Sequence, residues 1–259
     1  MFLDTIAEHV REELKSRRGK TPASALRERA LFALPTRGFA AALAGGARRG
    51  RHIVAEIKRA SPSQGTIRED FNVVKIAKNF AANGASALSV LTEERFFRGS
   101  LSYLEQIKNE VSIPLLRKDF TLDGYQLVEA RSFGADAALL IVALLERALL
   151  KELIAEAAAL SLDALVEVHT EGELACALEA GARLIGINNR DLNTFEVRLE
   201  TTERLLPLVP AGVVVVCESG FHSAEQIKRV EALGAHVFLI GEALMRAPDP
   251  GAKLRELLT

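Results

Sequence analysis

The chain has 259 residues, of which 49% are hydrophobic and 26% are charged, a balance typical of a soluble globular protein. Its formal net charge of −1 argues against nucleic acid or an anionic membrane as the main partner. The first 20 residues lack the apolar core of a secretory signal, and no stretch approaches the roughly 20 apolar residues of a membrane span. Together with only two cysteines, Cys176 and Cys217, these features favour a cytoplasmic protein without disulfides.

The first 50 residues carry helix signals and no strand signal. Residues 2–18 place Phe2, Ile6, Val10 and Leu14 on one stripe of a helix, and residues 24–33 are predicted to form a second helix. We therefore expect residues 1–50 to be an N-terminal helical extension of a single domain that spans residues 1–259.

From about residue 50, short aliphatic runs alternate with segments long enough for a helix. Strands are predicted to begin near residues 53, 86, 113, 136, 163, 183, 213 and 236. A Gly-Ala pair recurs before strands, as in AANGAS and ALEAGAR, and it is typical of a helix that ends at a glycine cap. Eight such units in about 200 residues favour a closed barrel over an open doubly wound sheet, and no G-x-G-x-x-G follows the first strand. The predicted fold is α/β, a (β/α)8 TIM barrel with an N-terminal helical extension.

Polar residues follow almost every predicted strand, at the end of a barrel where catalytic groups gather. Glu56 and Lys58 are two residues apart, so both side chains point to one face of their strand, and we predict that they face the barrel axis near its mouth. The other polar residues and glycines at strand ends are Lys118, Glu167, Asn188, Arg190, Glu218, Ser219, Gly220, Gly241 and Glu242.

Each of these residues also has a purely structural interpretation. Lys58 could simply neutralise Glu56, Asn188 could form a turn, and Ser219 with Gly220 could be an ordinary loop before a helix. His169 follows Glu167 closely, and we expect it to be solvated rather than a ligand. The five histidines form no motif, so we predict that no metal is bound.

The ends of the last two strands indicate a phosphate site. ESG at 218–220 and IGEA at 240–243 each end a predicted strand and precede a helical segment, and barrels often hold phosphate there on backbone N–H groups. Glu242 is unusual at an anion site, so we expect its carboxylate to point away while its N–H group faces the ligand.

Six motifs carry a resemblance to a known family: VAEIKRASPS (54–63), LRKDF (116–120), LVEVHT (165–170), IGINNRDL (185–192), CESG (217–220) and FLIGEALM (238–245). From about residue 50 onward the chain resembles the indole-3-glycerol phosphate synthase family in the order and spacing of these motifs. The resemblance implies that 1-(2-carboxyphenylamino)-1-deoxyribulose 5-phosphate closes to an indole ring and loses carbon dioxide and water. It implies a small sugar-phosphate substrate and no cofactor.

The resemblance also implies roles for individual residues. Lys118 matches the general acid that protonates the ketone oxygen, and Glu167 matches the general base of the last deprotonation. Lys58 matches a lysine that binds the substrate carboxylate and is also a candidate acid in the dehydration, while Glu56 would orient it. A general acid works best with a pKa near the working pH, which a lysine reaches through burial and neighbouring cations. The remaining matches are polar site residues (Asn188, Arg190, Glu218, Ser219), phosphate contacts (Ser61, Gly220, Gly241, Glu242) and the aromatic pocket (Phe97, Phe120, Ile141, Leu192).

The chain departs from the family pattern at one position, and two alternative functions stay open. Gln64 stands after Ser61-Pro62-Ser63, where the family often has a lysine, so one cation is missing from the loop over residues 59–68. We expect this loop to close over substrate. One alternative is a barrel enzyme similar to phosphoribosylanthranilate isomerase. The chemistry of that family relies on a cysteine and an aspartate, and Cys217 is a poor candidate for the cysteine because it lies just before a strand end. Another is a non-catalytic phosphate-binding barrel, which would be expected to have lost Lys118 or Glu167. The oligomeric state stays open, and a monomer is one possibility.

Overall fold

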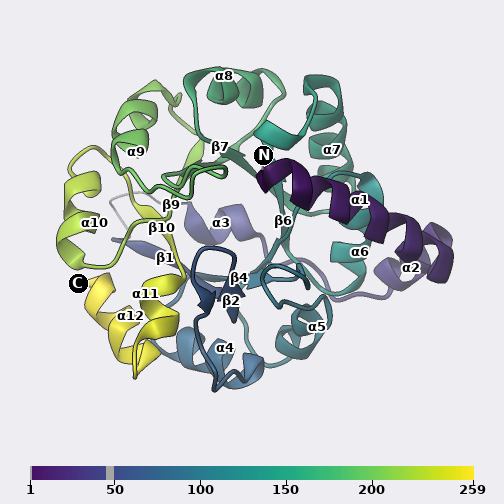
Figure 1. The fold of residues 1–259 in the computed structure, drawn as a ribbon, viewed down its shortest axis with the longest axis horizontal. Helices are drawn as coiled ribbons and strands as arrows, with labels where there is room; N and C mark the ends of the chain where they lie inside the picture. Colours follow the sequence, from purple (N-terminus) through teal and green to yellow (C-terminus); the bar gives the residue numbers. More distant parts are fainter. Residues whose placement is uncertain (1, 45–49) are drawn as a thin grey trace.

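The computed structural model describes residues 2–44 and 50–259. Within that part of the chain, eight parallel strands close into a barrel in the order β1-β10-β9-β8-β7-β6-β5-β4, as the sequence predicts. Figure 1 looks into this ring of strands, with most helices outside it. The strands begin within two residues of their predicted starts: β1 (His52–Ile57), β4 (Ala87–Leu91), β5 (Leu115–Lys118), β6 (Ala137–Ile141), β7 (Asp163–Val168), β8 (Leu184–Asn188), β9 (Val214–Glu218) and β10 (Val237–Ile240).

The helices that connect the strands begin and end at residues suited to those positions. Asn72 caps α4 by accepting a hydrogen bond from the Lys75 N–H group, and Ser223 and Gln226 form a capping box on α10. The glycines of these Gly-Ala pairs, Gly84, Gly134, Gly181 and Gly234, all have positive φ angles, which confirms the predicted glycine caps. The helices are α4 (Val73–Ala82), α5 (Ser102–Lys108), α6 (Gly124–Ser132), α7 (Arg147–Ala159), α8 (Glu171–Glu179), α9 (Glu200–Leu205), α10 (Ala224–Glu231), α11 (Glu242–Arg246) and α12 (Pro250–Leu258), with 3₁₀ turns η2 (Val142–Leu144) and η3 (Leu206–Leu208).

Within residues 2–44, the described part of the predicted N-terminal extension, the chain is helical and has one helix more than predicted. Helices α1 (Phe2–Lys20) and α2 (Ala23–Leu31) confirm the two predicted helices, and α3 (Phe39–Leu43) was not predicted. Ile6, Val10 and Leu14 are buried, while the side chain of Phe2 lies outside the described part. Figure 1 shows α3 behind the centre of the ring, and its buried residues Phe39 and Leu43 belong to the same hydrophobic cluster as side chains of the barrel interior.

A buried network of charges holds α1 against the barrel. Arg117 is 1% exposed and lies 2.9 Å from Asp119 and 2.8 Å from Glu129 of α6. Arg17 of α1 approaches the same Glu129 oxygen at 2.8 Å. Because each of these charges has a partner of opposite sign, the network can stay buried and fix α1 relative to β5.

The barrel interior is filled in layers. Val54, Leu116, Leu165 and Val216 are fully buried and belong to one hydrophobic cluster. They come from β1, β5, β7 and β9, which alternate around the ring, and this is the usual way that four side chains form a layer in such a barrel. The layer seals the interior below the residues described next.

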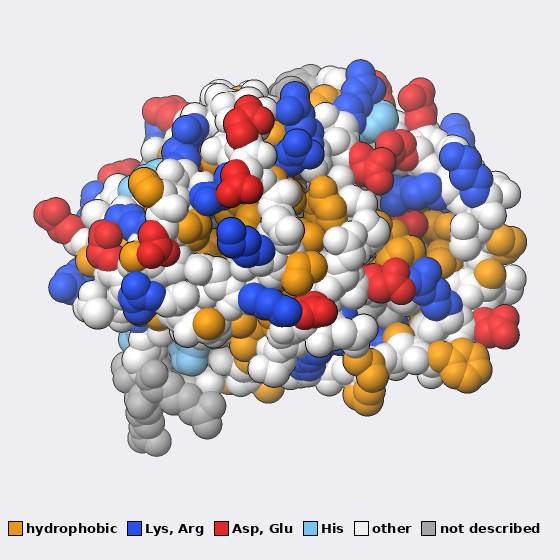
Figure 2. Space-filling view, turned by 90° about the horizontal axis from the view of Figure 1, so that it is seen from below, with side chains coloured by type: hydrophobic (Ala, Val, Ile, Leu, Met, Phe, Trp, Pro, Cys, Tyr) orange, Lys and Arg blue, Asp and Glu red, His pale blue; other side chains and the backbone are white. Residues whose placement is uncertain are grey.

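The outer surface carries charges of both signs. Figure 2 shows Lys and Arg side chains interspersed with Asp and Glu over the face that it draws. Among the described residues, no helix has the length and apolar character needed to cross a membrane.

Candidate active site

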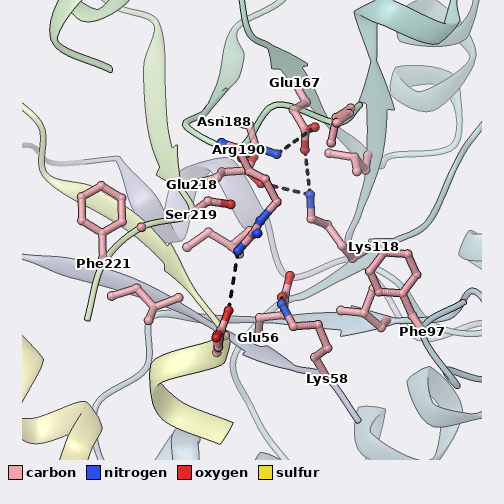
Figure 3. A pocket seen from close by; sticks show the side chains of 18 of the residues that line it. Glu56, Lys58, Phe97, Lys118, Glu167, Asn188, Arg190, Glu218, Ser219 and Phe221 are labelled. Carbon is pink, nitrogen blue, oxygen red and sulfur yellow. Dashed lines mark hydrogen bonds and ion pairs between the residues drawn. The ribbon is translucent and has the colours of Figure 1, made fainter. Parts of the chain in front are cut away.

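A layer of charged side chains lies above the hydrophobic layer. Each of the same four strands carries a charged residue two positions after its member of the hydrophobic layer: Glu56, Lys118, Glu167 and Glu218. Because side chains of a strand alternate between its two faces, all four point into the barrel. Lys118 Nζ lies 2.7 Å from Glu167 Oε2 and 3.0 Å from Glu218 Oε2 (Figure 3). Strands β5 and β9 face each other across the ring, so Lys118 bridges the barrel.

Lys58 joins this layer through Glu56. Its Nζ atom lies 2.6 Å from Glu56 Oε1, and the Ser89 hydroxyl lies 3.4 Å from the other carboxylate oxygen. The prediction that Glu56 and Lys58 share a face near the barrel mouth is therefore confirmed. Lys58 and Lys118 line the same cavity.

The surroundings of Lys118 differ from our expectation. We expected neighbouring cations to bring its pKa down towards the working pH, but its neighbours are carboxylates. Burial lowers the pKa of Lys118, and the negative charges of Glu167, Glu218 and Glu56 outweigh burial and raise it above its usual value. Lys118 is therefore firmly protonated.

The three carboxylates of the layer differ in their affinity for protons. Burial raises the pKa of each, but Lys58 and Lys118 hold the pKa of Glu56 below its usual value, and Lys118 and His169 do the same for Glu167. For Glu218, burial and the charge of Glu167 outweigh Lys118 and raise the pKa to about 7. The layer thus combines two ionised carboxylates with a third that titrates near neutral pH.

Two glycines make room for the carboxylates. A Cβ atom on Gly186 of β8 would lie 2.2 Å from Glu218 Oε1, and one on Gly241 would lie 2.5 Å from Glu56 Oε1. Glu218 Oε1 is buried and has no hydrogen-bond partner in the described structure. Sequence reasoning missed the role of Gly186, although a glycine inside a strand often marks such a close approach.

The predicted site residues come together. The cavity above the charged layer has an empty volume of about 890 Å³, including space open to solvent, which suits a small-molecule ligand. Ser61 does not line it but lies in an adjoining cavity that also contacts Lys58 and Arg190. The main cavity is lined by all the other predicted site residues: Glu56, Lys58, Phe97, Lys118, Phe120, Ile141, Glu167, Asn188, Arg190, Leu192, Glu218, Ser219, Gly220, Gly241 and Glu242.

One wall of the cavity is apolar. The rings of Phe97 and Phe120 have their centroids 6.0 Å apart, and Ile141 and Leu192 line the same space. Glu93 fixes the loop that carries Phe97, because its carboxylate accepts hydrogen bonds from the backbone N–H groups of residues 95–97. This wall can hold a flat aromatic ring.

Another part of the cavity wall has backbone features that suit an anion. Ser219 and Gly220 both have positive φ angles, and α11 begins at Glu242 with its first N–H groups free of intrahelical partners. The Glu242 carboxylate does not point away as expected. It remains at the cavity wall, 3.6 Å from Arg190 and 3.3 Å from Arg246, so two arginines neutralise it.

The first βα-loop forms a small hairpin beside this wall. Strands β2 (Ala60–Ser61) and β3 (Gly65–Thr66) pair in antiparallel fashion. Gln64 accepts a 2.7 Å hydrogen bond from Arg246 of α11. The contact ties the hairpin to α11, and closure of this loop over substrate stays a prediction.

His169 corrects another expectation. Its side chain is only 15% exposed, and its Nε2 atom lies 3.5 Å from Glu167 Oε1, whereas we expected it to be solvated. Asn188 donates a 3.1 Å hydrogen bond to the same Glu167 oxygen. The sequence does carry a signal for this position of His169. Thr170 and Glu173 have the spacing of a helix cap, and the Glu173 carboxylate accepts a hydrogen bond from the His169 backbone N–H group at the end of β7.

Neither a metal site nor a reactive cysteine is found among the described residues. Within residues 2–44 and 50–259, no group of three or more His, Cys, Asp or Glu side chains is arranged to hold a metal ion. The metal-free reaction stays a prediction. Cys217 is buried, and burial raises the pKa of its thiol to about 12, so it is a poor nucleophile.

Comparisons with known proteins agree with the motifs. The model of the indole-3-glycerol phosphate synthase family matches residues 3–257. The indole-3-glycerol phosphate synthase of Roseiflexus sp. is 49% identical over 264 residues, covering 99% of this chain and 97% of that protein. The indole-3-glycerol phosphate synthase of Albidiferax ferrireducens is 48% identical over 257 residues, covering 99% of this chain and 97% of that protein.

Solved structures show the fold alone. The 3-hexulose-6-phosphate synthase of Salmonella typhimurium superposes with a TM-score of 0.64 at 14% identity, covering 80% of this chain and 96% of that chain. The family assignment therefore rests on the sequence matches, and it agrees with the barrel and its charged layer. The chain belongs to the indole-3-glycerol phosphate synthase family.

Proposed function

We infer that this chain catalyses the reaction of its family. It converts 1-(2-carboxyphenylamino)-1-deoxyribulose 5-phosphate into indole-3-glycerol phosphate, carbon dioxide and water, a step of tryptophan biosynthesis. The observation that carries this inference is the family match over residues 3–257, and the residues at the barrel mouth suit the chemistry.

Ring closure needs a proton for the ketone oxygen. Lys118 is our candidate donor, since its ammonium group faces the cavity and is held at 2.7 Å by Glu167. A high pKa does not prevent this role, because the oxygen becomes an alkoxide-like base as the aromatic carbon attacks it. Loss of carbon dioxide then restores the aromatic ring.

Dehydration needs a second acid and a base. Lys58, held by Glu56, is our candidate to bind the substrate carboxylate and then to protonate the leaving hydroxyl. Glu167 is the candidate base for the last deprotonation, since its pKa is held low and Asn188 orients it. Ser219 and Glu218 would position the substrate and Lys118 respectively.

The two walls of the cavity suit the two ends of the substrate. Phe97, Phe120, Ile141 and Leu192 would enclose the aromatic ring, and Arg190 would pair with an anionic group. The backbone N–H groups near Gly220, Gly241 and Glu242, with Ser61 from the hairpin, would hold the phosphate.

The alternative functions find less support. An isomerase-like reaction that needs a reactive cysteine is disfavoured by the raised pKa of Cys217. A barrel that only binds phosphate would not need an acid and a base side by side, as Lys118 and Glu167 are at 2.7 Å. We further propose that the chain is one domain, works in the cytoplasm without nucleic-acid partners, and needs no metal or other cofactor.

A fluorescence assay for formation of the indole product tests the proposal. The full-length protein is incubated with the carboxyphenylamino substrate, with and without a chelator. We expect turnover that the chelator leaves unchanged. Absence of turnover by folded protein would refute the function, and strong inhibition by the chelator would refute the metal-free mechanism.

A further inference from the structure

The two rings of the aromatic wall are each held at the backbone by a buried carboxylate. Phe120 follows Asp119, whose Oδ1 atom accepts a 2.8 Å hydrogen bond from the Phe120 N–H group. Phe97 lies four residues after Glu93, whose Oε2 atom accepts a 2.9 Å hydrogen bond from the Phe97 N–H group. The position of each ring therefore depends on a carboxylate bound to its backbone.

Asp119 has the partners that a buried carboxylate needs for folding alone. Its Oδ2 atom lies 2.9 Å from Arg117 Nη2, and it also accepts a hydrogen bond from the Thr92 hydroxyl group. Arg117 belongs to the charge network that holds α1 against the barrel. The burial of Asp119 is thus accounted for by this network.

Glu93 is balanced in a different way. It is only 3% exposed, and its carboxylate accepts hydrogen bonds of 3.0, 2.7 and 2.9 Å from three backbone N–H groups, those of Arg95, Phe96 and Phe97. The charged neighbour with the largest effect on its pKa is Asp119, which has the same sign. Burial, with a smaller contribution from Asp119, outweighs the three hydrogen bonds and raises the pKa of Glu93.

The loop after β4 closes tightly around Glu93. The Gly99 N–H group donates a 2.8 Å hydrogen bond to the Glu93 carbonyl oxygen, and Arg98 has a φ of 51°. A Cβ atom on Gly99 would lie 2.4 Å from the Leu91 carbonyl oxygen, so the turn requires glycine there. Of residues 93–99, all of which the structure describes, only Phe97 lines the main cavity. The Phe97 ring is what this turn contributes to the site.

A carboxylate is an expensive way to build such a turn. Burying it among neutral donors lowers the free energy of unfolding compared with a neutral side chain. What it offers in return is two acceptor oxygens and a charge, which hold three consecutive N–H groups in one orientation. A rigid support of this kind is what a side chain in a binding wall needs.

We propose that Glu93 is a positioning residue for the aromatic end of the substrate, because its carboxylate holds the Phe97 ring in the wall. This deepens the proposed function and rests on it. Glu93 is not among the described residues that line the cavity, so it acts through Phe97. The aromatic ring is present in substrate and product alike, and loss of its support should therefore appear in KM rather than in kcat.

The test compares Glu93→Gln with wild type in the indole assay. Glutamine has nearly the same shape, but its single acceptor oxygen and lack of charge cannot hold all three N–H groups. The matched control is Glu94→Gln, which changes the exposed glutamate beside it. We expect the KM of E93Q to rise at least about fivefold while kcat stays within about twofold. E94Q should keep both constants within about twofold.

The double variant E93Q/F97A tests whether the effect passes through Phe97. If it does, the KM of the double variant should match that of F97A within about twofold, because Glu93 then has no ring to hold. A KM that rises by the product of the two separate effects would show that Glu93 acts by another route, and it would overturn the proposal.

A second variant, Glu93→Asp, keeps the charge on a shorter side chain and replaces E93Q if that variant does not fold. Its KM should be at least about twofold above wild type and below that of E93Q. An unchanged KM in the folded variants would overturn the proposal even if urea shows lower stability, because Glu93 would then support only the fold. A fall in kcat with unchanged KM would overturn it too. Absence of turnover in the wild type would refute the function itself, so the two failures are distinguishable.

Discussion

The contact between Gly186 and Glu218 gives a sharp test of how the charged layer holds Lys118. In the Gly186→Ala variant the new Cβ atom would lie 2.2 Å from Glu218 Oε1 and 3.4 Å from Leu165 Cδ1. An ordinary contact needs more than 3 Å, so the carboxylate must move by about 1 Å. That displacement lengthens the 3.0 Å contact between Glu218 Oε2 and Lys118 Nζ.

The size of the effect follows from this displacement. Misplacing a catalytic group by about 1 Å can cost roughly 100-fold in rate, and a hydrogen bond to a charged group contributes about 1.5–3 kcal/mol. We therefore expect kcat to fall by about 10- to 100-fold. Overpacking should lower the free energy of unfolding by about 1–3 kcal/mol.

The assay combines steady-state kinetics with urea denaturation. The matched control is Gly172→Ala in α8, where nothing lies within 4 Å of the new Cβ atom. It should leave kcat unchanged and leave stability equal or slightly higher. In the double variant G186A/E218A the clash is gone, so its stability should match that of E218A. A kcat of G186A within twofold of wild type would refute the reasoning.

Three further predictions concern pH, substrate binding and the core. The pKa of Glu218 is raised from 4.5 to about 7 in the folded protein, so the contribution of Glu218 to the free energy of unfolding falls as pH rises from about 4.5 to about 7. Glu218→Gln should therefore become more stable relative to wild type across that range. A constant difference in the free energy of unfolding, measured with urea at several pH values, would contradict this. Phe97→Ala should raise KM by about 5- to 100-fold through loss of the aromatic wall, and an unchanged KM in initial-rate measurements would argue against that role. Phe80 is fully buried, so Phe80→Ala should lower the free energy of unfolding by about 3–5 kcal/mol, and a loss below about 1 kcal/mol would mean that the site is loosely packed.

The barrel could be predicted because local signals repeat along the chain. Aliphatic runs mark the strands, and glycine caps such as Gly84 and Gly134 mark the helix ends. Helix α3 was missed because five residues (Phe39–Leu43) are too few to show a helical period, and its N-cap, Gly38, offers no side chain for capping. What holds α3 is the barrel interior, which is a tertiary contact.

The members of the site could also be predicted, but their mutual geometry could not. Strand-end positions and motifs named Lys118, Glu167 and Glu218. Which carboxylates surround Lys118 depends on the ring order and register of strands far apart in sequence, such as the Asn188–Glu218 pairing of β8 and β9. The expectation of cations around Lys118 was wrong for this reason.

The loss of activity in Lys118→Ala is the most direct test of the central claim, that a lysine within a layer of carboxylates provides the acid. The variant should still unfold cooperatively in urea, while its rate of indole formation falls by roughly 100- to 10,000-fold, the range for general acid catalysis. Turnover close to wild type in the folded variant would contradict the account.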